Sequence, residues 1–171
     1  MKPFDRRAYW FHFATVDGGV QVDVVSGPAG GWTDPRCPVA RTVDLVGDRW
    51  SLLIIRDAMD GASSFTDFRE RLGIARNILT DRLRRLVDHG VLATSTPPGG
   101  KRHVYRLTDA GQDLFTTVVA LRQWGERHAF ADDEPHSVLL DDNGGAVPEL
   151  VPRGQDGRPL SATTSHVRKT T

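Results

Sequence analysis

The stretch SFTDFRERLGIARNILTDRLRRLVDHGVLATSTPPGGKRHVYRLT, residues 64–108, decides the fold. It begins with a short helical pattern that Gly73 closes, and a second helical pattern follows over about 76–89. Two β-prone runs come next, at 91–96 and 103–107, and a turn rich in proline and glycine joins them. Two helices separated by a tight turn and followed by a β-hairpin are typical of a winged helix-turn-helix domain.

The ends of both helices carry capping signals. Ser64 precedes the first helix and Asp67 follows three residues later, which is the spacing of a capping box. Gly73 and Gly90 stand just past the two helices, where a left-handed backbone conformation ends a helix at low cost. The helix boundaries are therefore predicted by local chemistry as well as by hydrophobic periodicity.

The flanking sequence adds helices on both sides. Upstream, one helix is expected over about 38–46, and Asp48 can cap an apolar helix over about 50–59 that should be the central buried one. Downstream, Thr108 caps a long helix that reaches about His128. The predicted fold class is mainly α with a small β-wing: a winged helix-turn-helix domain with flanking dimerisation helices.

The chain divides into three expected parts: an N-terminal extension at 1–36, a DNA-binding and dimerisation domain at 37–130, and an acidic, Gly/Pro-rich C-terminal extension at 131–171. In the first part, 11–16 and 20–25 are β-prone runs that can pair as a hairpin, and a linker follows them. In the last part, 138–140 and 150–151 can pair as a small ribbon, which is too short of large apolar residues to build a core.

The composition is that of a soluble globular protein, since 39% of the 171 residues are hydrophobic and 26% are charged. No apolar run approaches the length of about 20 residues that crosses a bilayer. The aromatic run at 9–13, near the N-terminus, is preceded by charged residues and contains a histidine, so it lacks the apolar core of a signal peptide. We therefore expect a cytoplasmic protein without membrane contact. Cys37 is the single cysteine, which excludes an internal disulfide and a cysteine-rich zinc site within one chain.

The net charge of zero hides an uneven distribution. Between Arg69 and Arg106 there are nine basic and three acidic residues, a net charge of +6, whereas the chain after Ala131 carries −3. A local basic surface suffices for a nucleic-acid partner because phosphate attraction acts over about one Debye length. Charge alone also allows the simpler interpretation, a solvated arginine-rich face.

The polar side of the helix at 76–89 carries the candidate DNA contacts, while three leucines cluster on its other side. The candidates are Arg76, Asn77, Thr80, Arg84 and Arg85. Asn77, Thr80 and Arg84 are side-chain types that read base edges in a major groove. Arg76, at the start of the helix, can read a base or contact a phosphate. Arg82 lies nearer the core edge and is expected to pack or to contact a phosphate.

The turn of the hairpin, at about 97–103, is basic. Lys101 and Arg102 stand there, directly after the expected recognition helix. A basic hairpin in this position can place cations in the neighbouring minor groove or on its phosphates. Taken alone, the same residues would form only a solubilising turn.

Six short motifs carry a family resemblance: CPVAR (37–41), GDRWSLLI (47–54), FTDFR (65–69), LTDRLRRL (79–86), YRLTDAG (105–111) and WGER (124–127). In this order and spacing they resemble the HxlR-type winged-helix regulators over about residues 37–130. The resemblance implies a bacterial homodimer, held by the first and last helices, that binds operator DNA as a repressor or an activator.

The chain departs from the family pattern in three places. Ala75 stands where relatives often have a serine before the recognition helix, so capping is expected from Asn77 or from water. The first wing strand, at 93–96, lacks the usual arginine, which weakens the wing contact. The stretch 141–159 lacks the paired cysteines of some relatives, so no metal is expected there.

Cys37 has two open interpretations. Pro38 as the first helical residue puts Cys37 at the helix cap, where backbone dipoles favour the thiolate form. The family resemblance implies that a cysteine here can sense oxidants or electrophiles. The alternative is a small apolar residue that packs at the dimer edge.

Other functions are weighed against DNA binding. The six histidines show no metal-ligand spacing, and no catalytic motif occurs, so neither an enzyme nor a cofactor is expected. The first alternative is a regulator gated by a small aromatic ligand between the dimer helices, where Trp50, Phe115 and Trp124 could line a pocket. The second is a winged-helix protein-interaction module without DNA binding, which exposed arginines argue against. The expected partners are double-stranded DNA, a second copy of the chain and a small-molecule or oxidant effector.

Overall fold

The computed structural model describes residues 27, 28, 30–96 and 102–169. The expected N-terminal hairpin at 11–25, the turn at 97–100 and Lys101 lie outside the described residues.

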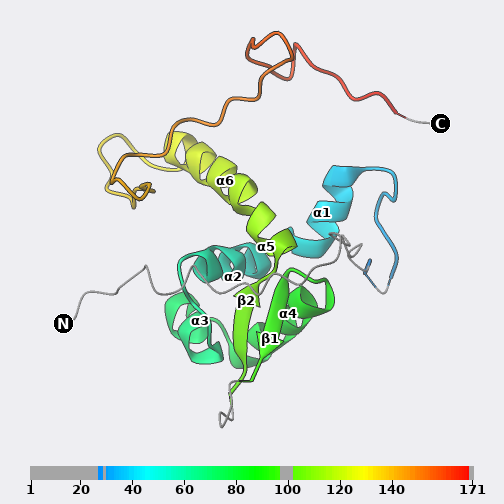
Figure 1. The fold of residues 1–171 in the computed structure, drawn as a ribbon, viewed down its shortest axis with the longest axis vertical. Helices are drawn as coiled ribbons and strands as arrows, with labels where there is room; N and C mark the ends of the chain where they lie inside the picture. The colour runs from blue at the N-terminus through cyan, green and yellow to red at the C-terminus, as the bar shows by residue number, and fades with distance from the viewer. Residues whose placement is uncertain (1–26, 29, 97–101, 170–171) are drawn as a thin grey trace, which may run out of the picture.

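The described elements follow the predicted order of helices, hairpin and helix. They are α1 (Pro38–Val46), α2 (Arg49–Met59), α3 (Phe65–Leu72), α4 (Arg76–Asp88), β1 (Leu92–Ser95), β2 (Val104–Leu107), α5 (Asp109–Asp113) and α6 (Phe115–His128). Helices α2, α3 and α4 and the β1–β2 hairpin form one body, and α1 and α6 extend from the side of it where β2 leads into α5 (Figure 1). The predicted fold class, mainly α with a small β-wing, is confirmed.

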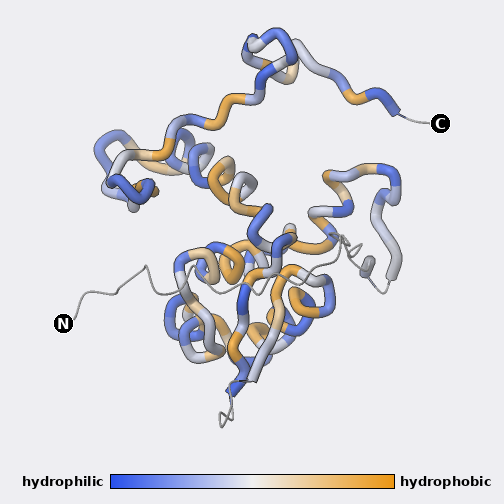
Figure 2. The backbone as a smooth tube through the Cα atoms, viewed as in Figure 1, coloured by the Kyte–Doolittle hydropathy of each residue, from blue (hydrophilic) through white to orange (hydrophobic). Residues whose placement is uncertain are grey.

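The core lies between α2, α3, α4 and the hairpin. Its largest fully buried apolar side chains are Phe68, Ile54, Ile55, Leu79, Leu83, Leu86 and Leu92. Helix α2 is buried as predicted, since it packs against α3, α4 and β2. Hydrophobic residues also run along α1 and α6, outside this core (Figure 2).

The predicted caps fix the start of α2 and of α3. The carboxylate of Asp48 accepts hydrogen bonds from the backbone N–H groups of Trp50 and Ser51. At α3, the Ser64 hydroxyl accepts from the N–H of Asp67, and the Asp67 carboxylate accepts from the N–H of Ser64, so the capping box is complete. The hydrogen bonds from Ser63 and Ser64 outweigh the opposing effect of burial and lower the pKa of Asp67.

The hairpin is antiparallel and sits against the segment before α3. Thr94 pairs with Tyr105 and Ala93 pairs with Arg106. The backbone N–H of Tyr105 donates to the Ser63 carbonyl, 2.7 Å away, and Ser64 forms an isolated bridge with Val104. The hairpin is thus fixed to the body by backbone hydrogen bonds.

The prediction of one long C-terminal helix is wrong. The helix is interrupted at Leu114, whose ψ of −6° departs from the α-helical value of about −42°. The Thr108 hydroxyl, bonded to the Gly90 carbonyl, and Gly111, close to the Val91 carbonyl, fix α5 to the body. Helix α6 leaves the body after the bend (Figure 1).

The predicted ribbon in the C-terminal extension is also wrong, because 138–140 does not pair with 150–151. Two local turns form instead, with bridges between Leu140 and Ala146 and between Arg153 and Pro159. The backbone hydrogen bonds of the first turn recur in the second with a spacing of 13 residues. Among the described residues, no helix is long and apolar enough to span a membrane.

Candidate nucleic-acid interface

Helices α3 and α4 form a helix-turn-helix around a turn of three residues, 73–75. Gly73 has a φ of 59°, a left-handed conformation that glycine adopts without strain. Ile74 follows and is buried in the core. No side chain caps α4 at Ala75, so the predicted cap by Asn77 is wrong. The first N–H groups of α4 therefore remain open to an anion such as a phosphate.

Helix α4 separates its residues as the sequence predicts. Leu79, Leu83 and Leu86 are buried in the core. The five candidate contacts are exposed along the rest of the helix: Arg76, Asn77, Thr80, Arg84 and Arg85. The structure thus brings these five candidates onto one accessible helix surface.

Asp81 organises the arginines of α4. Its carboxylate lies 2.8 Å from Arg82, 2.7 Å from Arg84 and 3.0 Å from Arg85. Sequence reasoning missed this arrangement, although the spacing of three and four residues was a signal for it. Asp81 alone cannot compensate the positive charges of both Arg84 and Arg85. Because a guanidinium has five N–H donors, Arg84 keeps further donors available while it is paired with Asp81.

Arg82 is a structural residue. Its side chain is only 23% exposed and lies 2.9 Å from the carboxylate of Asp48, the cap of α2. This ion pair joins α4 to α2, in agreement with the predicted packing role. Burial alone would raise the pKa of Asp48, but hydrogen bonds from Ser51 and the charge of Arg82 outweigh it and lower that pKa.

The start of α4 is held by two local contacts. The Arg76 guanidinium lies over the ring of Phe65 at 5.8 Å, which joins α4 to α3. The Thr80 hydroxyl donates to the Arg76 carbonyl at 2.9 Å. Thr80 can therefore offer a base its lone pairs and its methyl group, but its proton is already engaged.

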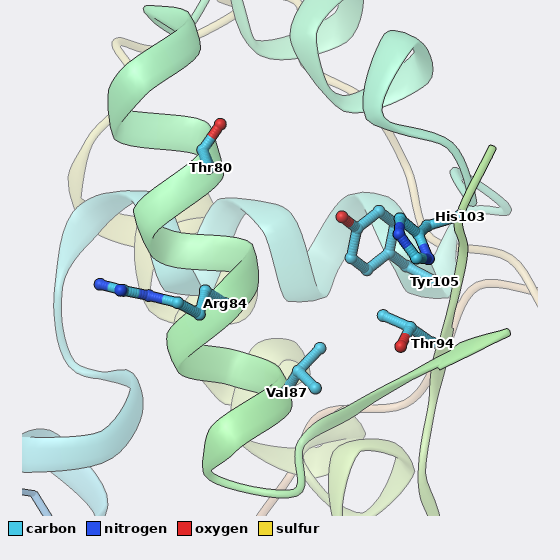
Figure 3. Close-up of a pocket in the computed structure, with 6 residues that line it drawn as sticks. All are labelled: Thr80, Arg84, Val87, Thr94, His103 and Tyr105. Atoms are coloured by element: carbon cyan, nitrogen blue, oxygen red, sulfur yellow. The ribbon is translucent and has the colours of Figure 1, made fainter. Parts of the chain in front are cut away.

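A groove separates α4 from the hairpin. It holds about 250 Å³ and is lined by Thr80, Arg84, Val87, Thr94, His103 and Tyr105 (Figure 3). Sequence reasoning missed Thr94, His103 and Tyr105, because their position opposite α4 depends on how the hairpin packs against that helix. Arg102 and Arg106 are exposed on the same hairpin.

Cys37 caps α1 as predicted. Its Sγ accepts a hydrogen bond from the N–H of Ala40 at 3.4 Å, and the residue is half-buried. The structure does not bring the three aromatic residues of the expected ligand pocket into one site. Trp50 packs against the core, whereas Phe115 and Trp124 are 47% and 58% exposed.

The C-terminal extension covers one side of α6. Gln123 donates to the Pro148 carbonyl and accepts from the N–H of Leu150, both at 2.9 Å, and Arg127 pairs with Glu149 at 3.1 Å. The α6 residues that face the extension are Val119, Arg122, Gln123 and Glu126. The opposite side of the helix carries four exposed residues, here called the α6 stripe: Thr117, Leu121, Trp124 and His128.

Comparisons with known proteins agree with this geometry. Residues 45–133 match the family model described as HxlR-like helix-turn-helix. The chain is 46% identical over 93 residues to Rv3095 of Mycobacterium tuberculosis, an uncharacterised HTH-type transcriptional regulator, covering 53% of this chain and 58% of that protein. The chain thus spans little more than half the length of that relative.

Solved structures show the same likeness. The crystal structure of PA1607, a candidate transcription factor, matches with a TM-score of 0.76 and 48% identity, covering 80% of this chain and 97% of that one. The reduced form of the redox regulator HypR matches with a TM-score of 0.52 and 28% identity. The match covers 54% of this chain and 94% of HypR.

Proposed function

Because the chain belongs to the HxlR-like helix-turn-helix family, we propose that it binds double-stranded DNA as a homodimer at an inverted-repeat operator. It is a transcriptional regulator of the winged-helix type and not an enzyme. The observation that carries the proposal is the surface of α4, which exposes arginine, asparagine and threonine beside a hairpin with two exposed arginines. These residue types read base edges and contact phosphates.

The roles of the individual residues follow from their positions. Asn77, Thr80 and Arg84 project from the exposed side of α4 and are proposed to read base edges in the major groove. Arg76, Arg85 and Arg102 are proposed to contact phosphates, together with Lys101 on the ground of its sequence position alone. Residues 37–130 are proposed to form the DNA-binding and dimerisation domain.

The α6 stripe and α1 support the homodimer. Leu121 and Trp124 are 50% and 58% exposed, and the C-terminal extension lies on the other side of the helix. Val39 and Val43, one helical turn apart on α1, are 71% and 57% exposed. Apolar side chains gathered on two projecting helices are typical of an oligomer interface, and the proposed occupant is a second copy of the chain.

The operator is expected to have dyad symmetry. A twofold dimer places its two recognition helices on one face of the DNA, so the half-sites should lie about 10–10.5 bp apart, or a multiple of this distance. Binding should weaken steeply between low and physiological salt because counterions are released from the phosphates. Selection of bound duplexes from random DNA checks the symmetry, and titrations at several salt concentrations check the salt dependence. Selected sites without dyad symmetry, or an affinity that does not change with salt concentration, would contradict the proposal.

Base reading and phosphate contact are expected to separate in two variants. Arg84→Ala should cost about 1–3 kcal/mol on the operator and relax the preference at one position in each half-site. Arg102→Ala should weaken all duplexes equally and reduce the salt slope by about 1. Arg153→Ala, in the C-terminal extension, is the matched control and should change neither the affinity for DNA nor the salt slope. The measurement is binding to a panel of singly mutated operators, and identical patterns for the first two variants would refute these roles.

Redox sensing by Cys37 is a second candidate function. It is favoured by the position of Sγ at the start of α1, where it accepts the Ala40 N–H, and by the likeness to HypR, a redox regulator. Cys37 is the only cysteine, so any disulfide formed on oxidation must join two subunits or join Cys37 to a small thiol. Cys37→Ser should then bind DNA without responding to oxidant. If oxidant leaves the DNA affinity of the unmodified protein unchanged, Cys37 is a packing residue.

Two alternatives remain. The first, a regulator gated by a small aromatic ligand between the dimer helices with Trp50, Phe115 and Trp124 lining the pocket, stays a prediction. A protein-interaction module would present exposed apolar anchors on α4, but charged and polar residues dominate its exposed surface.

A further inference from the structure

The groove between α4 and the hairpin offers hydrogen-bonding groups that the chain itself does not use. Thr94 and Tyr105 are directly opposite each other in the β1–β2 register, so their side chains share one face of the hairpin. Within residues 30–96 and 102–169, neither hydroxyl has a hydrogen-bond partner. The groove is open and its walls come from two separate elements, α4 and the hairpin (Figure 3).

Tyr105 is held rigidly. Its ring packs edge-on against the buried ring of Phe68, with centroids 6.2 Å apart and planes at 75°, and its backbone N–H is bonded to Ser63. Its hydroxyl points toward α4, whereas the guanidinium of Arg84 points away from the groove (Figure 3). A tyrosine hydroxyl is protonated at neutral pH and can donate a hydrogen bond, and burial raises the pKa of Tyr105 further.

The path of DNA over this surface follows from the proposed function, on which the present inference rests. A recognition helix occupies the major groove and a wing contacts the adjacent minor groove. Since one sugar–phosphate strand separates the two grooves, that strand must pass between α4 and the hairpin. We propose that the groove binds one backbone phosphate of each half-site, and that the hydroxyl groups of Tyr105 and Thr94 donate hydrogen bonds to the oxygens of this phosphate.

This contact differs from an arginine contact in a measurable way. A neutral hydroxyl binds a phosphate oxygen without neutralising its charge, so it releases no counterion. Loss of the hydroxyl should lower the affinity without changing its salt slope. A phosphate contact also carries no base information, so the loss should be the same on every sequence.

The experiment uses full-length Tyr105→Phe and Thr94→Val, each of which removes a hydroxyl and keeps the shape of the side chain. Each should weaken binding about tenfold, on the selected operator and on an unrelated duplex alike, with parallel salt plots. Thr116→Val, an exposed position on α6, is the matched control and should bind as the unmodified protein does. Thermal unfolding of each variant separates a local loss from a folding defect.

A second measurement replaces single operator phosphates with neutral methylphosphonates, one position at a time. At the position that crosses the groove, the unmodified protein should lose more affinity than Tyr105→Phe does, because the variant already lacks one of the hydrogen bonds to that phosphate. The inference is overturned if Tyr105→Phe binds DNA with unchanged affinity, if its affinity falls on the operator but not on the unrelated duplex, or if its salt slope is flatter than that of the unmodified protein. It is also overturned if the effects of Tyr105→Phe and of the methylphosphonate are additive at every phosphate position. An unmodified protein that binds no duplex at all overturns the proposed function as well, so the two failures are distinguishable.

Discussion

Leu121→Asp is expected to convert the proposed dimer into monomers and to weaken binding to an operator with two half-sites by roughly 10²- to 10⁴-fold. Leu121 is 50% exposed and lies in the middle of the α6 stripe, beside Trp124. A carboxylate placed there would be buried without a partner in the proposed interface, which is costly. Loss of the dimer also removes the advantage of two linked recognition helices, because each half-site must then be bound independently.

Sedimentation equilibrium and DNA titrations check this prediction together. Affinity for an isolated half-site should remain, since Leu121 lies on α6 and not on α4 or the hairpin. Val167→Asp is the matched control: Val167 is 89% exposed in the C-terminal extension, and its substitution should leave both the dimer and the operator affinity intact. A Leu121→Asp protein that remains dimeric would show that the interface lies elsewhere.

Local chemistry explains why much of the fold could be predicted. Asp48, Ser64 and Thr108 each bond to backbone N–H groups within three residues, and such short-range caps are visible in sequence. The end of α3 could also be predicted, because a left-handed backbone conformation is needed there and Gly73 adopts it without strain. The burial of one side of α4 follows from its periodicity alone.

The features that were missed depend on contacts between distant residues. We attribute the break at Leu114 to the contacts that fix α5 to the body, since Gly111 lies against Val91, which is 20 positions earlier in the chain. The first turn of the C-terminal extension and the segment directly after it pack on α6, for example through Gln123 and Pro148, and no short-range pattern predicts that pairing. Tyr105 can be identified as a groove residue only once the strand register is known, because that register places it opposite Thr94. Hydrophobic periodicity shows which side of an element is buried, but not which element covers it.

Gly111→Ala is expected to destabilise the protein by about 3 kcal/mol, which lowers Tm by roughly 10 °C. A Cβ atom at this position would lie 2.2 Å from the carbonyl oxygen of Val91 and 2.9 Å from a methyl group of Leu107. The carbonyl cannot easily move, since it accepts hydrogen bonds from both the N–H and the hydroxyl of Thr108. Either α5 shifts away from the hairpin or those bonds break, and both outcomes disturb the start of α6.

The sign of the effect makes this test specific. By helix propensity alone, alanine in place of a helical glycine stabilises by about 1 kcal/mol, so a large loss must come from the close contact with Val91. Ala110→Gly, at the exposed neighbouring position, is the matched control and should cost only about 0.5–1 kcal/mol. Urea unfolding of both variants gives the two free energies. If Gly111→Ala equals or exceeds the unmodified protein in stability, α5 does not approach Val91 as closely as the structure places it, and the bend at Leu114 loses its explanation.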